Sequence, residues 1–129
     1  MKTPENLKYG KTDEWIKLEG NIATIGISDY AQDQLSDIVY VEFNKDVDDV
    51  VKKDDILSTI ESVKAAGDVV SPVSGKVIGV NKGLANKPEL LNDDPYEKGW
   101  ICTVEISNPA EYDTLMSAKE YETYCAGRH

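Results

Sequence analysis

Apolar and polar residues alternate over several short stretches of the chain, and a period of two is typical of β-strands that bury one face. Residues 15–19 alternate in this way, and Gly20-Asn21 follows as a dipeptide typical of a two-residue hairpin turn. We therefore expect residues 15–19 and 22–27 to form a hairpin. Further β-rich stretches predict strands over residues 38–43, 56–63, 69–71, 76–80 and 100–106.

Helical signals are few, and they are strongest towards the C-terminus. Ser28 is a favourable N-cap ahead of apolar residues at helical spacing, which predicts a short helix over residues 28–35. Asn108-Pro109 combines an N-cap with a proline at the first helical position, and Ser117 can cap a second helix. Residues 108–124 are therefore expected to form a helical extension.

Short strands separated by turns, with little helix before the C-terminal part, predict a mainly β fold of the sandwich or small-barrel type. The chain has 129 residues, of which 40% are hydrophobic, enough for one domain with one modest core. We expect this core to span about residues 12–106, followed by the extension over about 108–124. Residues 81–99 show no clear period, so a long connection is expected there.

The charge balance and the lack of long apolar runs exclude several classes of partner. Asp and Glu number 24 against 14 Lys and Arg, which gives a net charge of −10. Nucleic acid and anionic membranes bind clusters of cations, so neither is expected as a partner. No apolar run approaches the roughly 18–20 residues that cross a membrane. Residues 1–5 resemble neither a signal peptide nor a transit peptide, and the sequence predicts a soluble, unexported protein.

Cysteine and histidine offer no candidate for catalysis or metal binding. Cys102 lies in an apolar stretch and is expected to be a small core residue, whereas Cys125 is expected to be more exposed. The two form no C-x-x-C motif and predict no disulfide. His129 is the only histidine, and no nucleophile–base pair or phosphate-binding loop is recognisable. An independent enzyme is therefore not expected.

Lys64 lies between two predicted strands, where a tight turn would present its side chain at the tip of a hairpin. Ala65 and Ala66 leave no bulk beside it, and Gly67 gives the turn backbone freedom. A lysine in such a place is normally just a solvated cation, but these neighbours also leave it accessible to a modifying enzyme. The turn alone is compatible with both interpretations.

The residues around Lys64 belong to a series of blocks that follow one another along nearly the whole chain. The blocks are Glu14-Trp15, Ala23-Thr24-Ile25-Gly26-Ile27-Ser28-Asp29-Tyr30-Ala31-Gln32, Val39-Tyr40-Val41-Glu42, Glu61-Ser62-Val63-Lys64-Ala65, Ser71-Pro72-Val73-Ser74-Gly75, Asn92-Asp93-Asp94-Pro95-Tyr96, Gly99-Trp100 and Ala118-Lys119-Glu120-Tyr121. On these blocks the chain, from about residue 7 to residue 124, resembles the H-protein of the glycine cleavage system, a lipoylated carrier.

The resemblance implies a hybrid barrel-sandwich of the lipoyl and biotinyl type, with a short internal helix and C-terminal helices. Residues 1–129 would then be a single lipoyl-carrier domain. Lipoic acid is implied to be the cofactor, joined to Lys64 through an amide that removes the charge of the lysine. Glu61 and Gly75 fall where lipoyl-type domains place residues that help the modifying enzyme recognise the hairpin.

A polar pocket for the loaded arm is also implied by the resemblance. Thr12, Glu14 and Asp68 fall where the family shelters the cationic aminomethyl group that the lipoyl arm carries. Carboxylates near an amine favour its charged form, which slows premature release. The alternative for Glu14 and Asp68 is an ordinary, solvated place on the surface.

The resemblance further implies the enzymes between which the arm moves. Glycine decarboxylase, a pyridoxal phosphate enzyme, loads the aminomethyl group and releases CO2. A tetrahydrofolate-dependent aminomethyltransferase takes the methylene and frees ammonia, and dihydrolipoamide dehydrogenase reoxidises the dithiol. A lipoate ligase or an octanoyltransferase supplies the lipoyl group. The chain itself would be a non-catalytic carrier, in the bacterial cytoplasm or, if the sequence is a processed organellar form, in the mitochondrial matrix.

Several departures from the family pattern bear on the pocket and on the turns. Asp13 stands where the family usually has histidine, and we expect it to add negative charge near the pocket. Asp48 and Asp54 occupy turn positions where the family tends to carry glycine. Aspartate tolerates positive φ better than most residues, so these turns are expected to survive at some energetic cost. Residues 44–48 also look one residue longer than usual.

Two other carriers and one other role compete with this interpretation. A lipoyl domain of a 2-oxoacid dehydrogenase complex is shorter, typically shows Asp-Lys-Ala at the hairpin tip and lacks an extension like residues 108–124. A biotinyl domain would carry methionines beside Lys64, where this chain has Val63 and Ala65. An H-like relative that donates lipoyl groups to other proteins, or that serves redox-linked signalling, stays open on the sequence.

Overall fold

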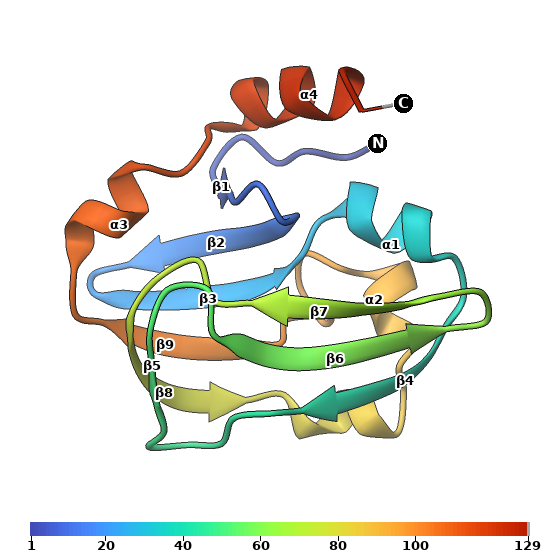
Figure 1. Ribbon diagram of the computed structural model, residues 1–129, viewed down its shortest axis with the longest axis horizontal. Helices are drawn as coiled ribbons and strands as arrows, with labels where there is room; N and C mark the ends of the chain where they lie inside the picture. The colour runs from blue at the N-terminus through green and yellow to red at the C-terminus, as the bar shows by residue number, and fades with distance from the viewer. Residues whose placement is uncertain (129) are drawn as a thin grey trace.

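Residues 1–128 are described by the computed structural model, and their strands form two antiparallel sheets (Figure 1). The larger sheet has six strands in the order β1-β2-β3-β9-β8-β5, and the smaller has three in the order β4-β6-β7. His129, the only histidine of the sequence, lies outside the described residues. The strands are β1 (Lys8–Tyr9), β2 (Glu14–Glu19), β3 (Ile22–Ile27), β4 (Ile38–Phe43), β5 (Val50–Val51), β6 (Ile56–Ser62), β7 (Ala66–Val70), β8 (Gly75–Val80) and β9 (Cys102–Ile106).

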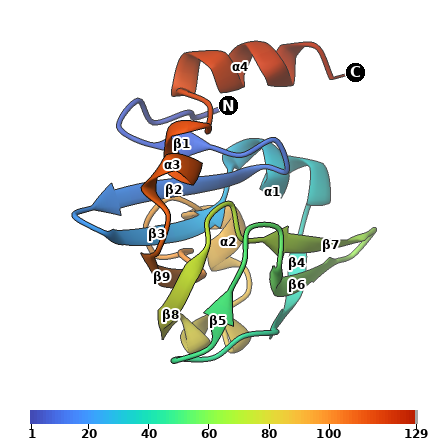
Figure 2. The same cartoon turned by 60° about the vertical axis from the view of Figure 1, so that its left-hand side comes forward.

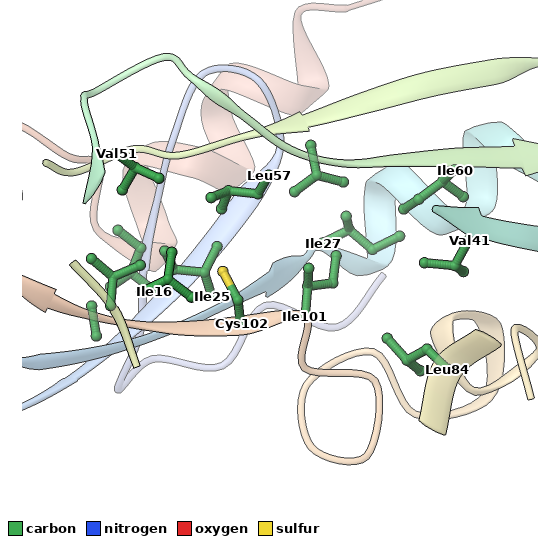
Figure 3. Packing of buried hydrophobic residues seen from close by; sticks show 14 of the residues in the cluster. Ile16, Ile25, Ile27, Val41, Val51, Leu57, Ile60, Leu84, Ile101 and Cys102 are labelled. Carbon is green, nitrogen blue, oxygen red and sulfur yellow. The ribbon is translucent and has the colours of Figure 1, made fainter. Parts of the chain in front are cut away.

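The hydrophobic core lies between the two sheets, and strands of both contribute side chains to it (Figure 3). Ile16 and Ile25 come from the larger sheet, Leu57 and Ile60 come from the smaller one, and each is at most 2% exposed. Cys102 belongs to the same cluster, as predicted for a small core residue. Burial of these apolar side chains is the main force that holds the sheets together. The prediction of a mainly β sandwich is confirmed.

The turns between strands adopt the conformations that the sequence predicted. β2 and β3 pair from Glu19 and Ile22 onward, and Gly20 between them has a φ of 65°, as a glycine at the first position of a II′ turn requires. Asp48 and Asp54 each have a φ of 78°. Aspartate therefore does hold the left-handed conformation where glycine was expected, at a cost of roughly 1 kcal/mol for each residue.

The helices begin at the predicted caps. Ser28 accepts a hydrogen bond from the N–H of Ala31 at 3.1 Å, and Ser117 forms a capping box with Glu120. No helix among residues 1–128 is long and apolar enough to cross a membrane. The helices are α1 (Asp29–Leu35), the 3-10 helix η1 (Lys82–Ala85), α2 (Leu90–Asp93), α3 (Pro109–Asp113) and α4 (Ala118–Ala126).

Some boundaries and short elements differ from the sequence-based prediction. β7 begins at Ala66, three residues before the predicted strand, and α4 extends two residues past its predicted end. The two-residue strands β1 and β5 were not predicted, and neither were η1 and α2 within the long connection. Elements this short contain too few residues to show a period of 2 or 3.6.

A second cluster of buried residues joins β1 to α4, which lies across β1 on the side away from the three-stranded sheet (Figure 2). Tyr9 and Tyr121 stack there with their ring centroids 4.6 Å apart. Cys125 is 4% exposed in the same cluster, so the expectation that it would be more exposed is wrong. It follows Tyr121 by four residues, which places both on the face of α4 that packs against β1.

Candidate functional site

Lys64 lies in the turn of the β6–β7 hairpin, and Ser62 fixes the backbone of that turn. The Ser62 hydroxyl oxygen accepts hydrogen bonds from the N–H groups of Lys64 and Ala65 at 3.3 and 3.0 Å. The Ser62 N–H donates to the Ala65 carbonyl at 2.8 Å. The Lys64 side chain is exposed and forms no ion pair with a described residue. The hairpin therefore presents an accessible amine on an ordered turn.

Glu61 and Gly75, both predicted to help an enzyme recognise the hairpin, do not lie in the same part of the fold. Glu61 is exposed near the end of β6 and pairs across the hairpin with Ala66. Gly75 is buried at the start of β8 in the other sheet, where an added Cβ would lie 2.1 Å from the Glu105 carbonyl oxygen. Packing against β9 therefore demands glycine at this position, whatever enzyme reads the hairpin.

Thr12 and Asp13 lie in the β1–β2 turn, and Glu14 follows them as the first residue of β2. Hydrogen bonds close this turn from the Asp13 N–H to the Gly10 carbonyl at 3.1 Å and from the Gly10 N–H to the Glu14 carbonyl at 2.9 Å. Asp13 adopts a left-handed φ of 75°, typical of the bulge residue in a short hairpin loop. The Thr12 hydroxyl donates to Glu14 Oε1 at 2.5 Å, so the turn also fixes the Glu14 carboxylate.

Glu14 is the only buried carboxylate among residues 1–128, at 1% exposure. Its Oε2 accepts a hydrogen bond from the Val70 N–H at 3.4 Å. Burial raises the pKa of Glu14 from 4.5 to about 7, although the hydrogen bonds from Thr12 and Val70 oppose this rise. Glu14 therefore changes its charge near neutral pH, and the alternative of a solvated surface acid is wrong for this residue.

Thr12, Glu14 and Asp68 line one cavity of about 340 Å³. Asp68 is exposed on β7, in the same hairpin as Lys64, and accepts a hydrogen bond from the Thr59 hydroxyl at 3.2 Å. We call this cavity the hairpin pocket. It is lined by Thr12, Asp13, Glu14, Ile27, Tyr30, Ala31, Gln34, Leu35, Ile60, Gly67, Asp68, Val69 and Arg128. Apolar side chains therefore form much of its wall, and the acidic groups face the same space.

Helix α1 forms one wall of the hairpin pocket, and Asn92 fastens its C-terminal end. The Asn92 amide donates to Gln32 Oε1 at 2.9 Å and to the Ser36 carbonyl at 2.7 Å. The Asn92 side-chain oxygen accepts from the Ile38 N–H at 2.9 Å, at the start of β4. The block that begins at Asn92 thus has a structural task, because it sets where α1 stands relative to the two sheets.

An ion pair between Asp13 and Arg128 was not anticipated. The guanidinium donates from two nitrogens to the two Asp13 carboxylate oxygens, at 2.5 and 3.0 Å. Asp13 does bring a negative charge to the pocket, as expected, and this charge is paired with a cation that lines the same pocket. Arg128 lies beyond the last matching block and carries no motif, so nothing in the sequence pattern pointed to it.

The described part of the chain contains no candidate metal site. Among residues 1–128, no group of three or more His, Cys, Asp or Glu side chains is placed to hold a metal ion. The two cysteines are buried and unpaired, and burial raises the pKa of Cys102 to about 12.

A sandwich that holds one accessible lysine on an ordered hairpin turn, beside a pocket lined by the same hairpin, defines a carrier of the lipoyl type. The family model described as glycine cleavage H-protein matches residues 7–128. The chain belongs to this family.

Individual relatives cover almost the whole chain. The chain is 52% identical over 125 residues to the glycine cleavage system H protein of Coprothermobacter proteolyticus, which covers 96% of this chain and 98% of the relative. It is 51% identical over 119 residues to the protein of the same name from Carboxydothermus hydrogenoformans, which covers 92% of this chain and 91% of the relative. A glycine cleavage system H protein from Mycobacterium marinum, solved by crystallography, has a TM-score of 0.86 at 27% identity and covers 95% of this chain and 98% of its own.

Proposed function

We propose that this protein is the lipoylated shuttle of the glycine cleavage system, with lipoic acid attached to Lys64. The family membership makes the chain a carrier component of that system. The observation that supports Lys64 as the attachment point is its exposed place in the hairpin turn, with only small side chains on its C-terminal side. When bound, the lipoyl group supplies the disulfide and dithiol chemistry that carries an aminomethyl group.

The hairpin residues present the amine and hold its base still. Ser62 restrains the turn, so the position of the Lys64 Cα is defined while its side chain is exposed to solvent. Amide formation at Nζ costs the protein no ion pair, because no described residue pairs with this ammonium group. Glu61, exposed on β6 three residues before Lys64, is proposed to help a lipoate ligase or octanoyltransferase recognise the hairpin.

The hairpin pocket is proposed to shelter the loaded end of the arm. Its apolar wall, which includes Ile60 and Val69, suits an alkyl chain. Thr12, Glu14 and Asp68 offer oxygen acceptors to an ammonium group. A carboxylate that faces an ammonium favours the charged amine, which is a poor starting point for release. The pocket would therefore retain the cargo until a partner enzyme opens access to it.

The partners are proposed to be glycine decarboxylase, the tetrahydrofolate-dependent aminomethyltransferase and dihydrolipoamide dehydrogenase. A net charge of −10 suits docking on basic surfaces of these enzymes, because complementary charge raises encounter rates. We assign no catalytic step to the chain itself, which presents, shelters and delivers the cargo. The relatives are bacterial, which favours the bacterial cytoplasm as the place of work.

Intact-mass analysis of protein from a lipoate-replete host tests the attachment point. The wild-type protein should gain the mass of one lipoyl group, and Lys64→Arg should abolish this gain. Lys87→Arg, at another exposed lysine, should leave the gain unchanged. An unmodified wild-type mass under these conditions would refute the carrier assignment.

The sheltering role of the pocket has a separate test. Glu14→Gln should speed the loss of the aminomethyl group from loaded, lipoylated protein, because the neutral amide no longer favours the ammonium form. Glu61→Gln removes an exposed carboxylate from the same hairpin and should leave the rate unchanged. Equal rates in wild type and Glu14→Gln would discard the pocket assignment without affecting the attachment point.

A further inference from the structure

Arg128 reaches from the end of the C-terminal helix to the β1–β2 turn, where its guanidinium contacts one carboxylate and two aromatic rings. Two of its nitrogens contact Asp13, as described above. The rings of Tyr30 and Tyr124 flank it, with their centroids 4.5 and 4.8 Å from its central carbon. Two aromatic rings and a bidentate carboxylate restrict the movement of this cation.

The Asp13 carboxylate also has a partner besides Arg128. Beyond the two bonds from Arg128, its Oδ1 accepts a hydrogen bond from the Tyr121 hydroxyl at 2.7 Å. The Tyr121 hydroxyl also lies 2.7 Å from the Ser28 hydroxyl at the cap of α1. Asp13 is only 15% exposed. This carboxylate therefore contributes a paired charge to the hairpin pocket, and its contacts join the turn, α1 and α4.

The pairing of Arg128 with Asp13 affects the balance of charge in the hairpin pocket. Three carboxylates line it, from Asp13, Glu14 and Asp68, and Arg128 is the only cation among its described lining residues. Without Arg128, the Glu14 carboxyl would face an unpaired negative charge from the residue next to it in the chain. Like charges at short range oppose ionisation, most strongly where water is excluded.

We propose that Arg128 is a positioning residue for Glu14: by pairing with Asp13 it weakens the negative charge that opposes ionisation of Glu14, so that the Glu14 carboxylate can act on the cargo. This inference rests on the proposed function, in which the hairpin pocket receives the loaded arm. Because the guanidinium is itself paired with Asp13, it presents no unbalanced positive charge to an ammonium group. A residue at the end of the C-terminal helix thereby adjusts the charge in a pocket formed mainly by the β-sandwich.

The remaining charged groups near Glu14 lie on its other side, in a second cavity of about 360 Å³. That cavity is lined by the titratable side chains of Tyr9, Lys11, Lys53 and Asp54 as well as by Glu14. These residues are shared by all variants described below, so their effect on Glu14 cancels in a comparison. Asp13 already opposes ionisation and raises the pKa of Glu14, after burial has made the larger contribution.

Carbon-13 NMR titration of the Glu14 carboxyl in unlipoylated protein tests the inference without the arm. Arg128→Gln should move the midpoint of Glu14 upward by roughly half a pH unit or more, because Asp13 loses its counter-charge. Asp13→Asn should move it downward, because Arg128 is then unpaired. The double variant should return close to the wild-type midpoint, and Arg128→Lys should lie between wild type and Arg128→Gln. Unchanged midpoints, or shifts of the same sign in both single variants, would overturn the inference.

Two further measurements separate this inference from the proposed function. Intact mass should show that Arg128→Gln accepts the lipoyl group at Lys64 as fully as wild type does, which a merely misfolded variant would not. In loaded protein, the pH dependence of aminomethyl loss should follow the Glu14 midpoint measured by NMR in each variant. If the NMR midpoints shift as expected while the loss profile stays fixed, the positioning of Glu14 stands and the pocket assignment of the proposed function fails.

Discussion

Replacing Glu14 by glutamine should remove a large part of the pH dependence of stability. In the folded protein the pKa of Glu14 is about 7, whereas its usual value is 4.5. Between these values the folded protein holds a proton that the unfolded chain releases, so the contribution of Glu14 is fully present below about pH 4.5. It is lost as the pH rises through about 7. At about 1.4 kcal/mol for each pKa unit, the loss amounts to roughly 3 kcal/mol.

Glutamine keeps the geometry and removes the titration. Its amide oxygen can accept from the Val70 N–H and its amide nitrogen can donate to the Thr12 hydroxyl, so both partners of Glu14 stay satisfied. Because the side chain is 1% exposed, solvent does little to soften the effect. The variant should therefore match wild type at about pH 5 and exceed its stability at about pH 8.5 by on the order of 2–3 kcal/mol.

Urea unfolding, followed by tryptophan fluorescence at both pH values, measures this difference. The quantity to compare is the change in unfolding free energy between the two pH values, because other titrating groups contribute equally to both proteins. Glu61→Gln serves as the control, since it removes the same charge from an exposed position. Parallel pH dependences in wild type and Glu14→Gln would refute the reasoning from burial.

Two further predictions concern the scaffold. Gly75→Ala should destabilise the protein by about 3 kcal/mol in urea unfolding, because its Cβ would meet the Glu105 carbonyl at 2.1 Å. Gly83→Ala, where the nearest atom lies 3.6 Å away, should be close to neutral, and equal losses would contradict the packing argument. Ser117→Ala should cost about 1 kcal/mol and speed amide exchange in the first turn of α4, because the capping box is lost. Ser107→Ala, at an exposed loop serine, should change neither.

The parts of the fold that could be predicted from the sequence are those with a local physical signal. The β2–β3 hairpin follows from alternation and a turn dipeptide, and the caps at Ser28 and Ser117 follow from side chains that bond to nearby backbone. Cys125 was misjudged because its burial depends on where α4 docks, which is a property of the tertiary structure. The packing of Gly75 against β9 was not predicted either, because this contact joins positions that the sequence does not bring together.

The candidate site likewise has a part that could be predicted from the sequence and a part that could not. Lys64, Glu14, Asp68 and Thr12 were located through the resemblance to the family, and the structure brings the last three to one cavity. Burial of Glu14 could not be predicted, because its hydrogen-bond partner Val70 on β7 is 56 residues away in the chain. The contact of Arg128 with Asp13 spans the chain almost from end to end, and a single sequence carries no signal for such a pair.

The aspartates with a left-handed backbone show where substitutions could stabilise the protein. Asp13, Asp48 and Asp54 all adopt positive φ, and glycine at such a position would relieve roughly 1 kcal/mol of strain. Against a typical total stability of about 5–15 kcal/mol, Asp48 and Asp54 together leave the protein room to become more thermostable without alteration of its pocket. Asp13 cannot be replaced in this way, because its carboxylate binds the guanidinium of Arg128, whereas the ion pair of Asp48 with Lys76 is exposed and contributes little. These three positions have nearly the same φ, but they differ in whether glycine can replace aspartate, and the contacts of the side chain decide this.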